Sequence, residues 1–314
     1  MADKLRKVLL PEDVSEVEWT GERYVPGVVG PIKTEHLHRY LCALTICRDK
    51  EVLDVACGEG YGCYIIAQVA KRVVGVDIDR ETIECATKRY GNEHISFSAG
   101  DCTRLPLQAD SVDVVVSFET IEHIVDHTGF LKEIKRVLRN DGVLIMSTPN
   151  RIVASPPDTR PNEFHVLELY KEEFQGLISG FFKNVLFFGQ KYMPCSVVCV
   201  DAGTSRRKPG DYLFMNSDRW GNVDLVDYVP RPQNVIAVAS DSGYEPLQIS
   251  ILEVSDDMIA KLYEEISNHD EEIRALEHDL AETRRALESV YNSTSWKVTA
   301  PLRWIAARLR GLRD

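Results

Sequence analysis

The chain has 314 residues, 44% of them apolar, and a formal net charge of −12. This size suits one large globular domain with an appendage, and the acidic balance disfavours a general nucleic-acid binder. The eight cysteines include no CxxC pair, which favours a reducing compartment. We find neither a signal peptide nor an apolar run long enough to span a membrane, and we therefore expect a cytoplasmic protein.

Residues 1–50 precede the first predicted strand and form an N-terminal helical or lid segment. Its part EWTGERYVPGVVGPIKTEHLHRY, residues 18–40, is rich in aromatic residues, His and Arg. As a lid it would close over a bound ligand, and in the alternative its side chains cover a helix surface. The side chains that could face the ligand are Tyr24, His36, His38 and Arg39.

Short apolar runs alternate with helical patterns from residue 51, as in EVLDVA, GYGCYIIAQVA, RVVGVDI, ETIECATKRY and HISFSAG. This alternation predicts a parallel sheet with right-handed crossovers. It continues with SVDVVVSF, the helix TGFLKEIKRVLRN closed by Asp141-Gly142, and VLIMSTP. FFKNVLFFGQ and NVIAVAS add two final strands, expected as an antiparallel pair, with a polar insert at 192–232 between them. We therefore predict a Rossmann-like, doubly wound, seven-stranded α/β sheet over residues 51–254.

A seven-residue repeat marks residues 255–291. Aliphatic residues occupy one heptad position five times, at Ile259, Ile266, Ile273, Leu280 and Leu287. This pattern predicts a C-terminal coiled coil over 259–290 and hence a homo-oligomer. His269 and Thr283 fall at the partner position and would weaken the packing. The alternative is a single amphipathic helix folded back on the domain.

Residues 292–314 form a basic amphipathic tail. Between 296 and 314 five Lys and Arg residues accompany one acid, so this segment carries +4 and the rest of the chain −16. Tryptophan and aliphatic residues interleave with the cations, which suits docking of 296–313 on an anionic membrane surface, at its inner face, or on a partner protein. The alternative is a segment packed within the oligomer.

Three acids stand at the ends of successive predicted strands. VLDVACGEGYG places Asp54, Gly58 and Gly60 where the first strand meets the first helix. Glycines there let the backbone approach a ligand, and a helix N-terminus favours an anionic group. Asp77 ends the second strand, where a carboxylate can bind a ribose diol, and Asp101 ends the third.

Five motifs in this order resemble the class I S-adenosylmethionine-dependent methyltransferases: DVACGEG at 54–60, GVDI at 75–78, GDC with LPL at 100–107, DVVV at 113–116 and LKEIKRVLRNDG at 131–142. The resemblance covers about residues 50–240 and implies S-adenosylmethionine as the cofactor. An NAD-binding Rossmann domain is the alternative, which LPL and the short spacing to the fourth strand disfavour. The resemblance implies a cofactor site made of Asp54, Gly58, Gly60, Asp77, Ile78, Asp101, Cys102 and Phe118.

The fourth predicted strand leads into ETIEH, where Glu119, Glu122 and His123 have the spacing i, i+3, i+4. On a helical turn this spacing puts all three side chains on one face. With His165 from NEFHVLELY they form a candidate site for Mg²⁺, Mn²⁺ or Zn²⁺. ExxEH with a later His resembles methyltransferases of ubiquinone precursors and of small-RNA 3′ ends, where a divalent metal lies beside the acceptor oxygen.

Two alternatives for ETIEH need no metal. In one, His123 is the catalytic general base and Glu122 orients it. In the other, Glu119 and Glu122 are solvated loop acids and only His123 matters.

The acceptor is suggested by a further resemblance. GERYVP, EHLHRY, NEFHVLEL and the ending SxSWxxTxPLR resemble methyltransferases of bacterial surface-polysaccharide (O-antigen, lipopolysaccharide) clusters. This implies a glycan acceptor, with transfer to a sugar hydroxyl on a lipid-linked chain that methylation could cap. The alternatives are a small-molecule or quinone-type acceptor, an RNA 2′-hydroxyl, which the acidic charge disfavours, and a scaffold without catalysis.

Overall fold

The computed structural model describes residues 8, 24–26, 28, 30–156, 162–193, 214–217, 223–226, 228–244, 246–247, 250–252 and 256–303. The contacts within the chain divide it into two units, Met1–Glu253 and Val254–Asp314. The first unit contains the central sheet. The second contains helices α7 (Asp256–Asn292) and α8 (Thr294–Val298).

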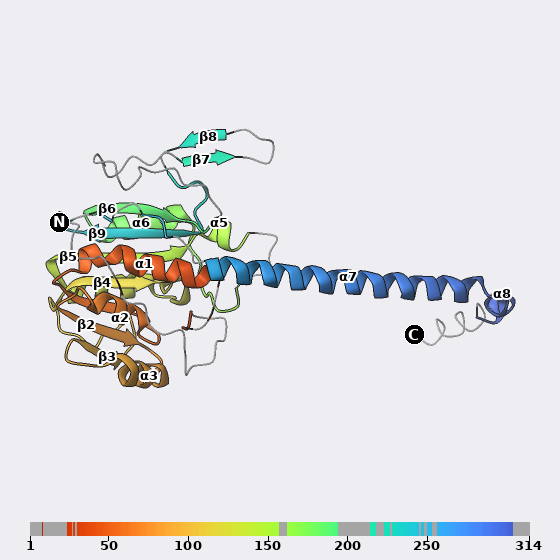
Figure 1. The fold of residues 1–314 in the computed structure, drawn as a ribbon. Coiled ribbons are helices and arrows are strands. Elements are labelled where there is room, and N and C mark those ends of the chain that lie inside the picture. Colours follow the sequence, from red (N-terminus) through yellow and green to blue (C-terminus); the bar gives the residue numbers. More distant parts are fainter. Residues whose placement is uncertain are drawn as a thin grey trace. The chain divides into compact units, whose positions relative to one another are not determined.

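A seven-stranded sheet forms the centre of the first unit (Figure 1). Its strands are β1 (Glu51–Val55), β2 (Arg72–Asp77), β3 (Ile95–Ala99), β4 (Val112–Phe118), β5 (Leu138–Pro149), β6 (Asn184–Gln190) and β9 (Asn234–Ser240). They pair in the order β3-β2-β1-β4-β5-β9-β6. The first five strands are parallel, and β9 runs antiparallel to both β5 and β6. The predicted seven-stranded sheet and its final antiparallel pair are confirmed.

Helices cover both faces of this sheet. They are α1 (Pro31–Cys47), α2 (Tyr61–Ala67), α3 (Arg80–Tyr90), α4 (His127–Val137), α5 (Arg151–Ala154) and α6 (Lys171–Phe181), with a short 3-10 helix η1 (Ile121–His123). Residues of α1, α2 and α3 pack in one apolar cluster and residues of α4 and α6 in the other. Val114 and Val116 enter the first cluster and Val115 the second, because successive strand side chains point to opposite faces.

The end of helix α4 differs from the sequence prediction. Helix α4 ends at Val137, and Asp141-Gly142 lies within β5 instead of closing a helix. Leu138 pairs with Val112 in the sheet. Strand hydrogen bonds thus take up the backbone N–H and C=O groups that a longer helix would have paired within itself. Between β3 and β4 the segment 100–111 forms turns and a single bridge between Asp101 and Arg104.

Parts of the predicted lid, insert and tail lie outside the described residues. Within the insert, strands β7 (Phe214–Ser217) and β8 (Val223–Val226) form a two-stranded antiparallel hairpin. Helix α1 accounts for most of the described part of residues 1–50. Residues 304–314 of the tail are not described, and no helix among the described residues is long and apolar enough to cross a membrane.

The second unit is dominated by helix α7, which contains the heptad repeat. The described apolar side chains of the repeat are between 48% and 70% exposed, namely Ile273, Leu276, Leu280, Leu287 and Val290. A helix that exposes such a row of aliphatic side chains at heptad spacing is expected to pair with other helices. This exposure agrees with the predicted coiled coil, and the pairing itself stays a prediction.

Substitutions in this row test the prediction. We expect the wild-type chain to be an oligomer, and Leu276→Glu with Leu280→Glu to produce monomers, because two charges would enter the apolar seam. Light scattering after gel filtration measures the mass. Ala275→Glu with Ser289→Glu adds the same charges at exposed positions away from the seam and should keep the wild-type mass. A monomeric wild type would contradict the prediction.

Candidate active site

A glycine loop joins β1 to α2 at the carboxyl edge of the sheet. Gly58 and Gly60 have φ values of 52° and 79°, in the left-handed region that favours glycine. A Cβ atom at Gly60 would lie 2.6 Å from the ring of Phe97. The amide of Gly58 donates to Oδ2 of Asp77 at 2.9 Å, which fixes the loop beside the end of β2.

The predicted nucleoside-binding acids Asp77 and Asp101 lie at the end of β2 and just after β3. Asp77 is 7% exposed, and its Oδ1 accepts from the amide of Asp79 at 3.0 Å. The next residue, Ile78, is 74% exposed and offers an apolar surface beside the predicted ribose-binding carboxylate. Asp101 is exposed and accepts from the amide of Thr103 at 2.7 Å. Cys102 is half-buried, and burial raises the pKa of its thiol to about 11.

The carboxyl group of Asp54 lies inside the protein below the loop. It accepts hydrogen bonds from the hydroxyl of Tyr40 at 3.2 Å and the thiol of Cys63 at 3.4 Å. Burial raises the pKa of Asp54 to about 7, against the lowering effect of these two hydrogen bonds, and the charge of Asp77 raises it further. The ring of Phe118, also buried, lies edge-on to Tyr40 with centroids 5.0 Å apart.

Asp54 should make the stability of the protein depend on pH. Burial raises the pKa of Asp54 from its usual 3.8 to about 7 in the folded state. Between these two pH values the folded protein binds one proton more than the unfolded chain, so it loses stability as the pH rises through them. Compared with Asp54→Asn, the wild type should lose up to about 4 kcal/mol of unfolding free energy between about pH 4 and pH 8. Urea unfolding at several pH values measures the difference, and parallel curves for the two proteins would contradict it.

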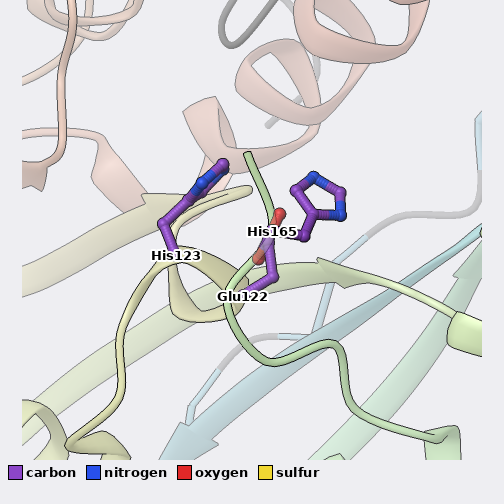
Figure 2. A group of neighbouring side chains, drawn as sticks. All are labelled: Glu122, His123 and His165. Carbon is purple, nitrogen blue, oxygen red and sulfur yellow. The ribbon is translucent and has the colours of Figure 1, made fainter. Parts of the chain in front are cut away.

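Three predicted ligands converge at the end of β4. Ligand atoms of Glu122, His123 and His165 all lie within 4.8 Å of one another. Glu122 and His123 come from η1, and His165 comes from the loop that follows α5. Figure 2 shows the carboxylate of Glu122 directed toward the space between the two imidazoles.

The loop of residues 162–168 holds this group together. The amides of Val166 and Leu167 donate to the carbonyl oxygen of Glu122 at 2.9 and 3.0 Å. Nδ1 of His123 lies 2.9 Å from the carbonyl oxygen of Phe164. Because a carbonyl only accepts, Nδ1 of the neutral ring carries the proton and Nε2 carries the lone pair.

The carboxyl group of Glu122 is fully buried and only partly satisfied. Its Oε2 accepts from the hydroxyl of Thr148 at 3.2 Å, and its Oε1 has no hydrogen-bond donor among the described residues. Burial raises the pKa of Glu122 well above its usual range, and the nearby charge of Glu119 raises it further. A buried carboxyl oxygen without a donor, beside two imidazoles, suits a bound cation.

Glu119 does not join this group, unlike the sequence prediction. Its backbone has a φ of 51°, and η1 begins only at Ile121, so the helical spacing i, i+3, i+4 does not apply. Its Oε1 accepts from the hydroxyl of Ser147 at 2.6 Å. When the side-chain amide of Asn234 is oriented with its nitrogen toward Glu119, that nitrogen donates to Oε2 of Glu119 at 3.2 Å.

Arg39 supplies the cation that faces Glu119. Its side chain is 1% exposed, and Nη1 lies 3.8 Å from Oε1 of Glu119. Nη1 also donates to the side chain of Gln190 at 2.7 Å, and the guanidinium lies 5.9 Å from the ring centroid of Phe118. Helix α1 is thereby linked to the ends of β4 and β6. The sequence indicated Arg39 only as one of four lid residues.

The other three lid residues lie in different surroundings. Nδ1 of His36 lies 2.8 Å from the hydroxyl of Tyr61, and the ring of Tyr24 packs edge-on against Tyr61 at 5.0 Å. His38 contacts the hydroxyl of Ser250 at 2.8 Å at an exposed position.

Comparison with known proteins finds methyltransferases that are similar to part of the first unit. Residues 53–146 match the family model described as a methyltransferase domain. A probable S-adenosylmethionine-dependent methyltransferase of Mycolicibacterium smegmatis is 42% identical over 167 residues, which are 52% of this chain and 64% of that protein. One from Mycobacterium tuberculosis is 40% identical over 164 residues, 51% of this chain and 58% of that protein. A ubiquinone biosynthesis O-methyltransferase of Actinobacillus pleuropneumoniae is 32% identical over 109 residues, 32% of this chain and 47% of that protein.

Residues 53–146 are therefore similar to a methyltransferase domain, and the first two relatives are probable S-adenosylmethionine-dependent methyltransferases. The alignments span 47% to 64% of the lengths of these relatives.

Proposed function

We propose that this chain is an O-methyltransferase that transfers the methyl group of S-adenosylmethionine to a sugar hydroxyl of a lipid-linked surface polysaccharide. A divalent cation held by Glu122, His123 and His165 would prepare that hydroxyl. The observation that carries the proposal is the convergence of these three side chains within 4.8 Å at the end of β4. Strand β4 pairs with β1, whose end carries the glycine loop, so the two sites occupy neighbouring strand ends.

The chemistry explains why such a group is needed. A sugar hydroxyl is a weak nucleophile at neutral pH, so its attack on a sulfonium methyl needs a base or a Lewis acid. A bound divalent cation would lower the pKa of that hydroxyl. Within this chain, Glu122 supplies the negative charge, and the two histidines supply nitrogen ligands that Mn²⁺ and Zn²⁺ accept readily and Mg²⁺ less so.

In the alternative without a cation, His123 takes the proton of the acceptor itself. Its Nδ1 is bonded to the carbonyl oxygen of Phe164, so Phe164, and not Glu122 as the sequence suggested, would orient the ring. A positioned base of this kind contributes about 10²- to 10⁴-fold to the rate.

The acceptor is inferred from the sequence motifs shared with polysaccharide methyltransferases. The basic segment 296–313 would suit an acceptor at a membrane surface; in its described part, Val298 and Leu302 are 71% and 67% exposed. A small-molecule or quinone-type acceptor is the second candidate, favoured by the likeness to the ubiquinone biosynthesis O-methyltransferase. The charge of −16 outside the tail disfavours RNA.

Transfer from labelled S-adenosylmethionine to candidate glycans and quinone precursors, with and without a chelator, tests the proposal. We expect glycan methylation that falls at least about 10²-fold with chelator and returns when Mn²⁺ or Zn²⁺ is added in excess. Turnover that is insensitive to the chelator would assign the chemistry to His123 alone. Methylation of quinone precursors without any glycan product would refute the glycan acceptor.

A further inference from the structure

The carboxylate of Glu168 contacts the imidazole of His165, whose ring Figure 2 shows beside Glu122 and His123. We propose that Glu168 is a positioning residue that fixes the tautomer and orientation of His165 for cation binding. This inference rests on the proposed cation site.

Contacts at both nitrogens of the His165 ring support this role. Nδ1 lies 2.5 Å from Oε1 of Glu168, and a carboxylate in this position accepts the Nδ1 proton. Nε2 lies 3.1 Å from Nδ2 of Asn162. The amide oxygen of Asn162 accepts from the amide of Phe164 at 3.0 Å, so its nitrogen faces the ring and donates. The two contacts agree that Nδ1 carries the proton and Nε2 carries the lone pair.

Glu168 is itself held in place. Its side chain is 9% exposed, and its Oε1 also accepts from the hydroxyl of Ser155 at 2.7 Å. Ser155 directly follows α5, so this carboxylate is anchored to a second element besides its own loop. A carboxylate fixed in this way limits rotation of the His165 ring.

The consequence for cation binding follows from general metal-site chemistry. A ligating histidine that donates its other N–H to a carboxylate is oriented and more basic, and loss of such a partner costs about 10- to 100-fold in metal affinity. A cation at His165 would replace the amide of Asn162 at Nε2. His123 receives the equivalent support from a backbone carbonyl, that of Phe164, which no side-chain substitution removes. Glu168 is therefore the residue through which this support can be tested.

Mn²⁺ titration of the full chain, followed by electron paramagnetic resonance of the free ion, tests the inference. Glu168→Ala should raise the dissociation constant about 10- to 100-fold. Glu168→Gln should raise it less, because its amide oxygen can still accept from Nδ1, and it keeps the shape of the side chain should the alanine variant fold poorly. Glu163→Gln removes a charge from an exposed position of the same loop and should leave the constant within about twofold, since exposed charges act weakly.

Nitrogen-15 NMR of the His165 ring gives a second readout that a general loss of packing would not reproduce. The wild type should show the Nδ1–H tautomer, and Glu168→Ala, in which only the Asn162 contact still favours that tautomer, should lower its population. If the wild type binds Mn²⁺ and Glu168→Ala binds it with the same dissociation constant, the inference about Glu168 is overturned and the proposed cation site stands. Absence of Mn²⁺ and Zn²⁺ binding by the wild type would overturn the proposed cation site and this inference with it.

Discussion

Glu122→Gln should lower kcat for methyl transfer by about 10²- to 10⁴-fold without lowering the stability of the fold. The wild-type carboxyl is fully buried, and its Oε1 has no donor among the described residues. Replacing it with a neutral amide of the same shape removes a group that is costly to bury in its charged form. Activity and stability should therefore change independently, as at a site kept for function. Initial rates with saturating S-adenosylmethionine and thermal unfolding of the same preparations measure both quantities.

Calorimetry with S-adenosylhomocysteine provides the control for this variant. The dissociation constant of Glu122→Gln for S-adenosylhomocysteine should stay near the wild-type value. Glu122 lies at the predicted acceptor side and not among the predicted cofactor-binding residues. Glu163→Gln should retain wild-type rates. Wild-type turnover by Glu122→Gln would show that the buried acid takes no part in the chemistry.

Arg39→Ala should have the largest effect on stability, a loss of about 3–5 kcal/mol in the free energy of unfolding. Arg39 is 1% exposed and faces Glu119, whose carboxylate would stay behind without its cation. The side chain of Gln190 would lose its donor as well. Urea unfolding of the variant and the wild type measures this loss.

Two comparisons make this prediction specific. Lys71→Ala removes an ion pair with Glu51 in which Lys71 is 69% exposed, and it should cost no more than about 1 kcal/mol. Arg39→Met with Glu119→Gln removes both charges of the pair and should recover much of the stability lost in Arg39→Ala. A loss in Arg39→Ala no larger than that in Lys71→Ala would contradict the role assigned to the pair of Arg39 and Glu119.

The sheet and the strand-end acids could be predicted because their signals are local. Runs such as VVVSF have the length and composition of a buried strand, and Asp54 and Asp77 follow directly from where such runs end. Parallel strands then bring those ends to one edge. The end of α4 was less predictable. Pairing of Leu138 with Val112 decides it, and that contact joins residues far apart in the sequence.

The candidate site depended on features that sequence spacing alone does not show. The left-handed backbone at Glu119 separates this acid from Glu122, although the spacing ExxEH suggests one face. Its partners Arg39 and Asn234 come from distant parts of the chain. Glu168 was not predicted, although the sequence holds a signal for it. The spacing i, i+3 from His165 places a carboxylate within reach of an imidazole.

Crystals of the full chain grown with S-adenosylhomocysteine and Mn²⁺, measured with anomalous scattering, would test the central claim most directly. We predict a manganese peak about 2.0–2.3 Å from an oxygen of Glu122 and from Nε2 of both His123 and His165, with the ribose of the nucleoside at Asp77. A bound nucleoside with no peak at these three side chains, or with their ligand atoms turned apart, would contradict the account.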